Sequence, residues 1–262
     1  MNEKHPISLV VITCNEERNI ARCLGAADFC REMIVVDSGS TDRTIEIARA
    51  LGARVMHRDW SGYGDQKNYG TAQAENEWVL CIDADEVVSE ELRQSILAAF
   101  RIAPTVDAFE INRRGFYAGT PIRHSGWSPQ WRTFLYRKGC AEWGGQEPHS
   151  VVIFRGRSKT RLAGELRHFT YASIRQHVAK NTASAQAAAE GMVREGRRAT
   201  LADLLVRPPW AFVRSYIAQL GFLDGFYGFV IGVMNAHYTF IKYAVFRELM
   251  RQSKVATDAD AR

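Results

Sequence analysis

The residues of this sequence with the clearest potential for chemistry are carboxylates that follow an apolar run. Residues 78–82 form a run of strand length, which ends in Asp83-Ala84-Asp85-Glu86. Such a run is typical of a strand buried on both faces of an α/β sheet. Carboxylates this close repel one another unless a cation lies between them, and Mg²⁺ or Mn²⁺ held by carboxylates usually also carries a substrate phosphate. The spacing favours a metal–diphosphate site, with solvated turn acids as the alternative.

Two earlier apolar runs also end in polar residues. Residues 7–13 lead into Thr13-Cys14-Asn15, and residues 33–36 lead into Asp37. Parallel strands place their carboxyl ends on one edge of a sheet, where open α/β sheets bind ligands, so these residues are expected to converge on a nucleotide-type pocket. Neither a GxGxxG after the first run nor a GxxxxGK[ST] occurs, which argues against dinucleotide-binding and P-loop enzymes.

The elements that must position these residues alternate between strands and helices. Further strands are predicted at 53–56 and 78–82, and helices at about 16–26, 43–51, 66–74 and from Ser89 onward, with Asn15 as the expected cap of the first helix. This alternation indicates βαβ units and a mostly parallel sheet flanked by helices. Residues 113–149 are rich in Gly, Trp, Arg and Pro, which is typical of acceptor-binding or lid loops.

The composition is that of a folded protein with one large domain, or one domain with an appendage. The chain has 262 residues, 46% hydrophobic and 24% charged. A net charge of +5 and a pI near 9.0 fit anionic substrates or an anionic membrane surface and are too weak to indicate nucleic acid. The five cysteines lack CxxC spacing and are expected to be reduced, cytosolic thiols. No basic-then-apolar leader opens the sequence, so secretion is not expected.

The C-terminal third has a different character. A helix is predicted over 172–196, then a linker over 197–209, an aromatic and apolar block with scattered basic residues over 210–250, and a disordered tail over 253–262. The longest charge-free run, 225–241, is at the short limit for a membrane-spanning helix. Helices lying in the membrane interface explain the block, with a dimer interface or a helical cap as alternatives. The expected division is therefore 1–170 as the catalytic domain, with nucleotide-binding (6–100) and acceptor (101–170) halves, and 171–252 as a helical extension.

Several segments together resemble a known family. Residues 8–17 (Ser-Leu-Val-Val-Ile-Thr-Cys-Asn-Glu-Glu), 35–42 (Val-Val-Asp-Ser-Gly-Ser-Thr-Asp) and 83–86 resemble the family 2 glycosyltransferases of GT-A fold. The chain is most similar to the bacterial lipopolysaccharide-core β-glucosyltransferase group, in which a Gly-Tyr-Gly-x-Gln-Lys-Asn segment, here 62–68, precedes the acidic strand. The resemblance is specific over about 6–100 and looser over 101–250.

The resemblance implies an inverting, metal-dependent transfer of a sugar, most often glucose, from a UDP-sugar. The implied acceptor is an envelope glycan or the lipopolysaccharide core, with polyprenyl phosphate as an alternative. Such a displacement needs a base for the acceptor hydroxyl and a cation, Mn²⁺ or Mg²⁺, for the departing diphosphate. The expected partners are the donor, a glycan or glycolipid acceptor and the cytoplasmic membrane surface, without nucleic acid. The expected location is cytoplasmic, peripheral to the inner membrane, and a homo-oligomer through the C-terminal helices is an open option.

The resemblance also implies roles for individual residues. Asp37 would face the uracil and Asp85 would bind the metal, while Asp83 would contact the ribose or the metal. Of the two candidate bases, Glu147 is preferred to His149, because a carboxylate serves this role across the fold. His149 is followed by Ser150, where an acid is usual in this group. The remaining expected contacts are Thr13, Asn15 and Glu16 to base and ribose, Lys67, Asn68 and Ala84 to the donor, and His168 to the metal.

Two rival classes fit less well. A nucleotidyltransferase would need a Gly-rich, basic loop after the first strand, where Cys14-Asn15-Glu16-Glu17 stands. A catalytically silent sugar-nucleotide binding protein is disfavoured by the intact acids, although the departure at Ser150 is compatible with it.

Overall fold

The computed structural model describes residues 4–145 and 150–260 and divides the chain into two compact units. The first unit comprises Met1–Arg114 and Pro129–Phe169. The second comprises Gly115–Ser128 and Thr170–Arg262.

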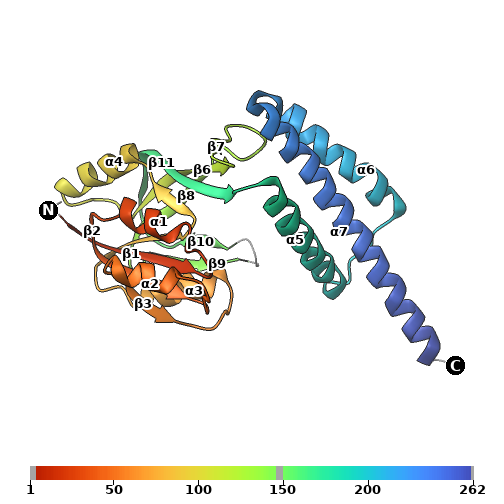
Figure 1. Cartoon of the computed structure of the whole chain (residues 1–262), viewed down its shortest axis with the longest axis horizontal. Coiled ribbons are helices and arrows are strands. Elements are labelled where there is room, and N and C mark those ends of the chain that lie inside the picture. The colour runs from red at the N-terminus through yellow and green to blue at the C-terminus, as the bar shows by residue number, and fades with distance from the viewer. Residues whose placement is uncertain (1–3, 146–149, 261–262) are drawn as a thin grey trace. The chain divides into compact units, whose positions relative to one another are not determined.

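The first unit follows the predicted alternation of strands and helices (Figure 1). Its N-terminal elements are β1 (His5–Thr13), α1 (Ile20–Ala26), β2 (Cys30–Asp37), α2 (Thr44–Ala50), β3 (Arg54–His57), α3 (Tyr63–Ala72), β4 (Trp78–Asp83), β5 (Glu86–Val88) and α4 (Glu90–Arg101). The strands that follow are β6 (Ala108–Tyr117), β8 (Trp131–Arg137), β9 (Ala141–Gly144), β10 (Val151–Phe154) and β11 (Lys159–Tyr171); β6 and β11 run on into the second unit.

The main sheet is mixed. Among the described residues the strands are ordered β3-β2-β1-β4-β8-β6-β11-β5, with the two-residue β7 (Thr120–Pro121) beside β6. The first four strands in that order are mutually parallel, and β8 joins them antiparallel to β4. The predicted fold class, an α/β sheet flanked by helices with further helices at the C-terminus, is confirmed.

The register of β1 explains how the polar strand ends come together. Thr13 lies opposite Asp37 of β2, and Ile12 lies opposite Asp83 of β4. Because the three strands are parallel, their carboxyl ends share one edge of the sheet, as the sequence predicts.

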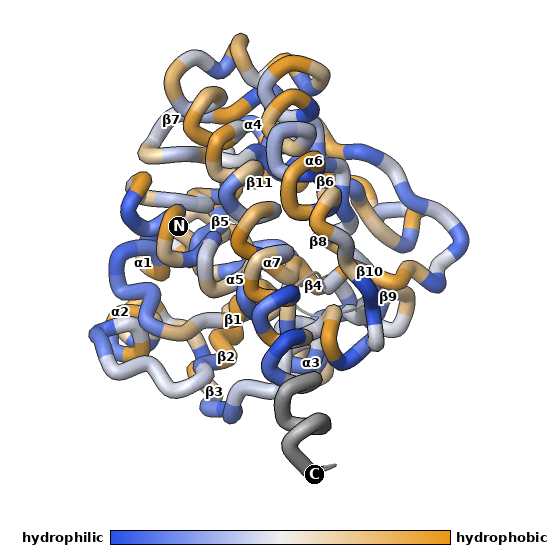
Figure 2. The backbone as a smooth tube through the Cα atoms, turned by 90° about the vertical axis from the view of Figure 1, so that its right-hand side faces the viewer, coloured by the Kyte–Doolittle hydropathy of each residue, from blue (hydrophilic) through white to orange (hydrophobic). Residues whose placement is uncertain are grey.

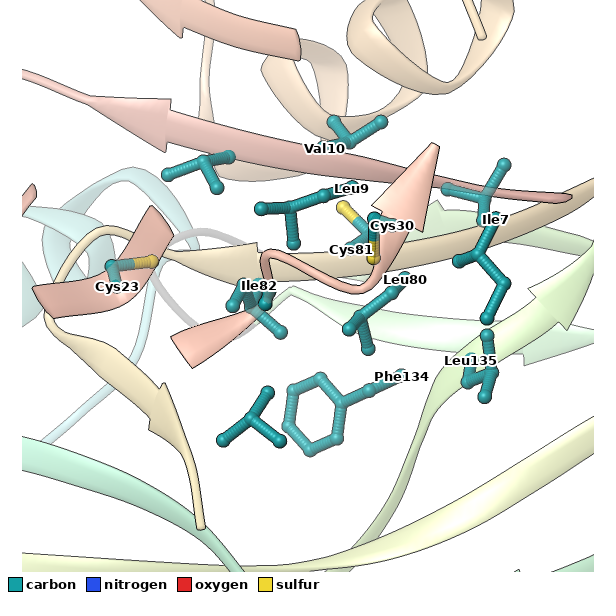
Figure 3. Close-up of a cluster of buried hydrophobic side chains, with 14 of the residues drawn as sticks. Ile7, Leu9, Val10, Cys23, Cys30, Leu80, Cys81, Ile82, Phe134 and Leu135 are labelled. Atoms are coloured by element: carbon teal, nitrogen blue, oxygen red, sulfur yellow. The ribbon is translucent and has the colours of Figure 1, made fainter. Parts of the chain in front are cut away.

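The core of the first unit lies on both faces of these strands. Figure 3 shows side chains of β1 and β4 above Phe134 and Leu135 of β8. Helix α3 packs directly on β1, since a Cβ atom added at Gly70 would lie 2.5 Å from Val10 Cγ1. Only glycine allows this approach, and it fixes the helix that carries Lys67.

The loop after β1 differs from expectation. Helix α1 begins at Ile20, so Asn15 is not its cap. Asn15 has φ 57°, and its side-chain oxygen accepts a hydrogen bond from Thr41 N at 2.8 Å. The side chain therefore ties the loop to the turn after β2, because a nonlocal backbone donor lies within its reach. The start of α4 is as predicted, with Ser89 Oγ accepting from Leu92 N.

The second unit is built on α5 (Ile174–Arg194), α6 (Leu201–Phe212), a π-helical turn (Val213–Ala218), a 3₁₀ turn (Gly221–Asp224) and α7 (Gly225–Asp260). The predicted linker over 197–209 is wrong from Leu201 onward, because α6 continues through Pro208 and Pro209. A capping box between Thr200 and Asp203 starts this helix, and Pro208 is buried. Capping and packing thus outweigh the hydrogen bonds that two prolines remove.

The helices of the second unit pack around small clusters. Ala189 and Met192 of α5 meet Tyr243 and Phe246 of α7. Buried polar groups join the same two helices, because Asn181 Nδ2 donates to the carbonyl oxygen of Met234 at 3.1 Å. No single helix among the described residues is long and apolar enough to cross a membrane. The segments Leu201–Ala218 and Gly221–Gln252, bent by 71°, meet that requirement only when counted together.

Candidate active site

The acidic turn after β4 is held in place from both sides. Glu86 Oε2 accepts a hydrogen bond from Asp83 N at 2.9 Å, which closes the turn on itself. Phe169 N donates to the carbonyl oxygen of Asp85 at 2.9 Å, and Glu86 lies opposite His168 in the β5–β11 pair. The turn is therefore fixed by a strand some eighty residues later in the sequence, and His168 is brought beside the acids.

Asp85 and His168 form a pair at this turn. His168 Nε2 lies 3.3 Å from Asp85 Oδ2, and the side chains are 16% and 18% exposed. Arg22 is near enough to Asp85 for their charges to interact, and its guanidinium lies 3.5 Å from the centre of the Phe169 ring. Burial lowers the pKa of Arg22, while the charge of Asp85 acts in the opposite direction. A partly exposed carboxylate and imidazole side by side are suited to bind a cation from solution.

Asp83 has a different partner. Its Oδ1 atom lies 2.8 Å from Lys67 Nζ. Burial acts to lower the pKa of Lys67, but the Asp83 charge outweighs it and raises that pKa. Burial likewise acts to raise the pKa of Asp83, but Lys67 and Arg113 outweigh it and lower that pKa. Each group thus keeps the other charged.

A second buried ion pair lies behind the turn. Glu86 is fully buried, and its Oε1 atom lies 2.6 Å from Arg113 Nε. Burial raises the pKa of Glu86. Burial acts to lower the pKa of Arg113, but the charges of Glu86 and Asp83 outweigh it and raise that pKa. The carboxylates of the turn are therefore held beside fixed cations.

Arg132 adds a further positive charge near the turn. It lies on β8 opposite Ile111 of β6, two residues from Arg113, so the two arginines are diagonal neighbours on one face of the sheet. Burial lowers the pKa of Arg132, and the charge of Arg113 lowers it further. Guanidinium groups in this arrangement can bind the oxygens of a phosphate.

The predicted nucleotide-binding residues lie together at the sheet edge, but several of them form hydrogen bonds within the loops that follow the strands. Asp37 is fully buried, and its Oδ2 atom accepts from Gly39 N and Ser40 N, both at 2.9 Å. Glu16 N donates to Thr44 Oγ1 at 2.8 Å. Thr13 is buried, and its hydroxyl has no hydrogen-bond partner among the described residues. Asp37 therefore shapes the edge with its carboxylate.

Asn68 clamps helix α3 to β9. Its side chain accepts from Trp143 N at 2.9 Å and donates to the Trp143 carbonyl oxygen at 2.8 Å. The Trp143 ring then lies 4.1 Å from Lys67 Nζ, and its indole nitrogen donates to Tyr136 OH at 2.9 Å. Asn68 thus positions the tryptophan against which Lys67 rests. Ala84 is buried within the acidic turn.

The candidate bases Glu147 and His149 lie outside the described residues. The strands on either side of them are described, and β9 and β10 pair antiparallel with Gly144 opposite Val151.

The predicted metal set is only partly assembled. Within residues 4–145 and 150–260 no group of three or more His, Cys, Asp or Glu side chains could hold a metal ion. Asp85 and His168 are together, whereas Asp83 is paired with Lys67. A carboxylate–imidazole pair fits Mn²⁺ or Mg²⁺ when substrate phosphate and water supply the remaining ligands.

Sequence reasoning gave no role to Glu86, Arg113 or Trp143. Glu86 precedes the polar residues that begin the next helix, a position typical of a solvated side chain, whereas the structure buries it. The adjacent arginines Arg113-Arg114, at the start of the segment rich in Gly, Trp, Arg and Pro, were the available signal for a cation at this edge.

The acidic turn, flanked by buried cations, lies at the carboxyl edge of an α/β sheet, where such folds bind anionic ligands. The sequence matches Glycosyl transferase family 2 over residues 8–161, more than half of the chain. The protein belongs to this family and is a glycosyltransferase.

Similar proteins cover nearly the whole chain. An uncharacterized glycosyltransferase of Rickettsia typhi is 32% identical over 97% of this chain and 91% of its own length. The lipopolysaccharide core biosynthesis glycosyltransferase LpsC of Rhizobium meliloti is 26% identical over 93% of each. Among solved structures, glucosyl-3-phosphoglycerate synthase of Mycobacterium tuberculosis, crystallised with Mn²⁺, UDP-glucose and phosphoglyceric acid, is 26% identical with a TM-score of 0.35. That alignment spans 43% of this chain and 44% of the synthase.

Proposed function

We propose that this glycosyltransferase moves a sugar, glucose in the first instance, from a UDP-sugar to an envelope glycan or lipopolysaccharide-core acceptor, with inversion at the anomeric carbon. The observation that carries the proposal is the pairing of Asp85 with His168 beside the fixed cations Lys67 and Arg113. The similarity to LpsC over 93% of both chains supports an envelope acceptor.

The arrangement fits the charge changes of such a transfer. As the bond from the anomeric carbon to the diphosphate breaks, negative charge develops on the departing oxygen, and preorganised positive groups stabilise it. Arg113 and Arg132 are in place for this, because their strands hold them beside the turn. A Mn²⁺ or Mg²⁺ ion held by Asp85 and His168, with Asp83 close by, would supply Lewis-acid stabilisation of the same charge.

The donor's nucleoside would lie along the edge formed by β1 and β2. We assign Thr13, Asn15, Glu16 and Asp37 to this half of the site, with Lys67, Asn68 and Ala84 toward the ribose and diphosphate. The Thr13 hydroxyl has no partner within residues 4–145 and 150–260, and it would offer a hydrogen bond to the base or ribose. Asp37 and Asn15 would act mainly by fixing the loop backbone that faces the nucleoside.

The donor assignment can be tested with a panel of nucleotide sugars. We expect UDP-glucose, in the presence of Mn²⁺, to raise the melting temperature more than GDP- or CMP-sugars, because a ligand that binds only the folded state stabilises it by mass action. Slow release of UDP that requires the metal should accompany binding. A larger shift with a non-uridine donor would contradict the donor assignment. Transfer to polyprenyl phosphate, and not to a core oligosaccharide, would replace the proposed acceptor.

Glu147 is proposed as the base that takes the proton of the acceptor hydroxyl, with His149 as the alternative. Replacing Glu147 with Gln is expected to lower kcat by about 10²- to 10⁴-fold, which is the usual contribution of a general base. Donor affinity, measured by titration calorimetry with UDP and Mn²⁺, should be unchanged. His149→Ala serves as the matched comparison. Normal turnover in Glu147→Gln together with a large loss in His149→Ala would transfer the role to His149.

A further inference from the structure

The exposed side of α6 and of the turn after it is apolar, whereas the exposed side of a surface helix is usually polar. Its spacing places large hydrophobic side chains on one side of the helix, and these are 41–64% exposed. They are Leu201, Leu205, Val206, Trp210, Val213 and Ile217. The two ionic residues of α6, Asp203 and Arg207, bond to each other along the edge of this side, where Arg207 lies one turn before Trp210. The hydropathy along the helix can be followed in Figure 2.

Helix α7 continues the exposed apolar surface. Phe226, Phe229, Val233 and Phe240 recur at helical spacing and are 41–65% exposed. The turns between the helices add Leu220, Phe222 and Leu223, which are 45–58% exposed. We call these residues, with those of α6, the apolar face. Exposed apolar surface of this extent marks an interaction site in a folded protein.

The charges around the apolar face are mainly positive. Residues 194–252 contain eight Lys or Arg and four Asp or Glu. Two of the acids are engaged within the unit: Asp203 closes the capping box of α6, and Asp224, 3% exposed, accepts from Arg123 N and His124 N at 2.9 Å. Arg214 is exposed beside the apolar residues of the π-helical turn. Arg197 and Arg207 are paired with Glu195 and Asp203, and the eight cations against four acids leave the segment a net charge of +4. The surface therefore combines aromatic side chains with an excess of positive charge.

We propose that the apolar face is a docking surface for an anionic lipid membrane, with α6 and the first half of α7 lying in the headgroup region. Three observations carry this. The helices reach the hydropathy of a membrane span only as a pair bent by 71°, which suits insertion from one side. The exposed residues include Trp210 and four phenylalanines, and Trp and Phe are typical of the apolar side of helices that lie in the membrane interface. The surrounding cations complement anionic lipid.

Charge also favours lipid over a second copy of this chain. A symmetric dimer through the apolar face would bring two net positive surfaces together, whereas an anionic membrane neutralises them. The proposal does not depend on the identity of the donor or the acceptor.

Flotation of the full-length protein with lipid vesicles tests the docking surface. We expect binding to vesicles of phosphatidylcholine with phosphatidylglycerol, and at least about tenfold weaker binding to phosphatidylcholine alone. The variant Phe226→Ser/Phe229→Ser should bind the anionic vesicles about tenfold or more weakly, since it removes large apolar groups from the face. Arg214→Glu should weaken binding to anionic vesicles and leave binding to neutral vesicles unchanged.

Ile102→Ser is the matched control, because Ile102 is 81% exposed but belongs to the first unit. It should bind as the unaltered protein does. Melting curves and UDP binding show whether each variant is folded. If one of these variants fails to fold, a second measurement tests the proposal without it. Vesicles of brominated lipid should quench the tryptophan fluorescence of the unaltered protein more than that of the conservative variant Trp210→Phe.

Three results would overturn the proposal. One is the absence of binding to either vesicle. Another is equal loss of binding in Ile102→Ser and in the double variant. The third is a stable dimer in light scattering that Phe226→Ser/Phe229→Ser converts to a monomer without changing vesicle binding, which would assign the apolar face to a second copy.

Discussion

Replacing Asp85 with Asn is expected to lower kcat for sugar transfer by about 10²- to 10³-fold, the range typical of losing one group that stabilises charge in the transition state. Asn keeps the shape of the side chain but removes the charge that pairs with His168 and would hold the cation. Steady-state kinetics with the donor identified by the panel, at saturating Mn²⁺, measures the effect. The melting temperature should change little, because Asp85 is partly exposed and its backbone bond to Phe169 is kept.

Asp28→Asn is the control for this prediction. Asp28 pairs with Arg93 near the amino-terminal ends of the strands, at the end of the sheet opposite the site. Its replacement removes an acid without touching the acidic turn and should leave kcat unchanged. Full activity in Asp85→Asn would remove Asp85 from the proposed cation site, and equal losses in both variants would indicate a general effect of charge.

Glu86→Ala is expected to lower the free energy of unfolding by about 3–5 kcal/mol, the usual effect of leaving a buried charge without its partner. Glu86 is fully buried, pairs with Arg113 and accepts the hydrogen bond from Asp83 N. Urea unfolding followed by circular dichroism measures the change. Glu86→Gln should lower the free energy of unfolding by less, because its amide oxygen can still accept the hydrogen bond from Asp83 N.

Glu46→Ala provides the contrast, since the Glu46–Arg43 pair is exposed on both sides. Exposed pairs contribute little to stability, so this variant should unfold at the same urea concentration as the original protein. If Glu86→Ala also unfolds at the same urea concentration as the original protein, the buried pair does not hold the turn. If Glu86→Ala is destabilised but keeps its UDP affinity, the pair is structural and does not organise the donor site.

Much of the first unit could be predicted from local patterns. The strand over 78–82 could be predicted because a buried parallel strand is a continuous apolar run. The start of α4 could be predicted because Ser89 is followed by two acids. The convergence of Thr13, Asp37 and Asp83 needed only the rule that parallel strands end on one edge, and the register of β1 satisfies it. The linker was mispredicted, because Pro208-Pro209 is a local breaking signal that capping and packing override.

The sequence by itself determined the family, the strand–helix alternation and the position of the acids, since these depend on composition and spacing along the chain. Only the tertiary structure decided which cation meets which acid. Lys67 faces Asp83, Arg113 faces Glu86, and His168 faces Asp85, across separations of 16 to 83 residues. These pairings depend on strand register and on the close contact of α3 with β1, which no local pattern encodes.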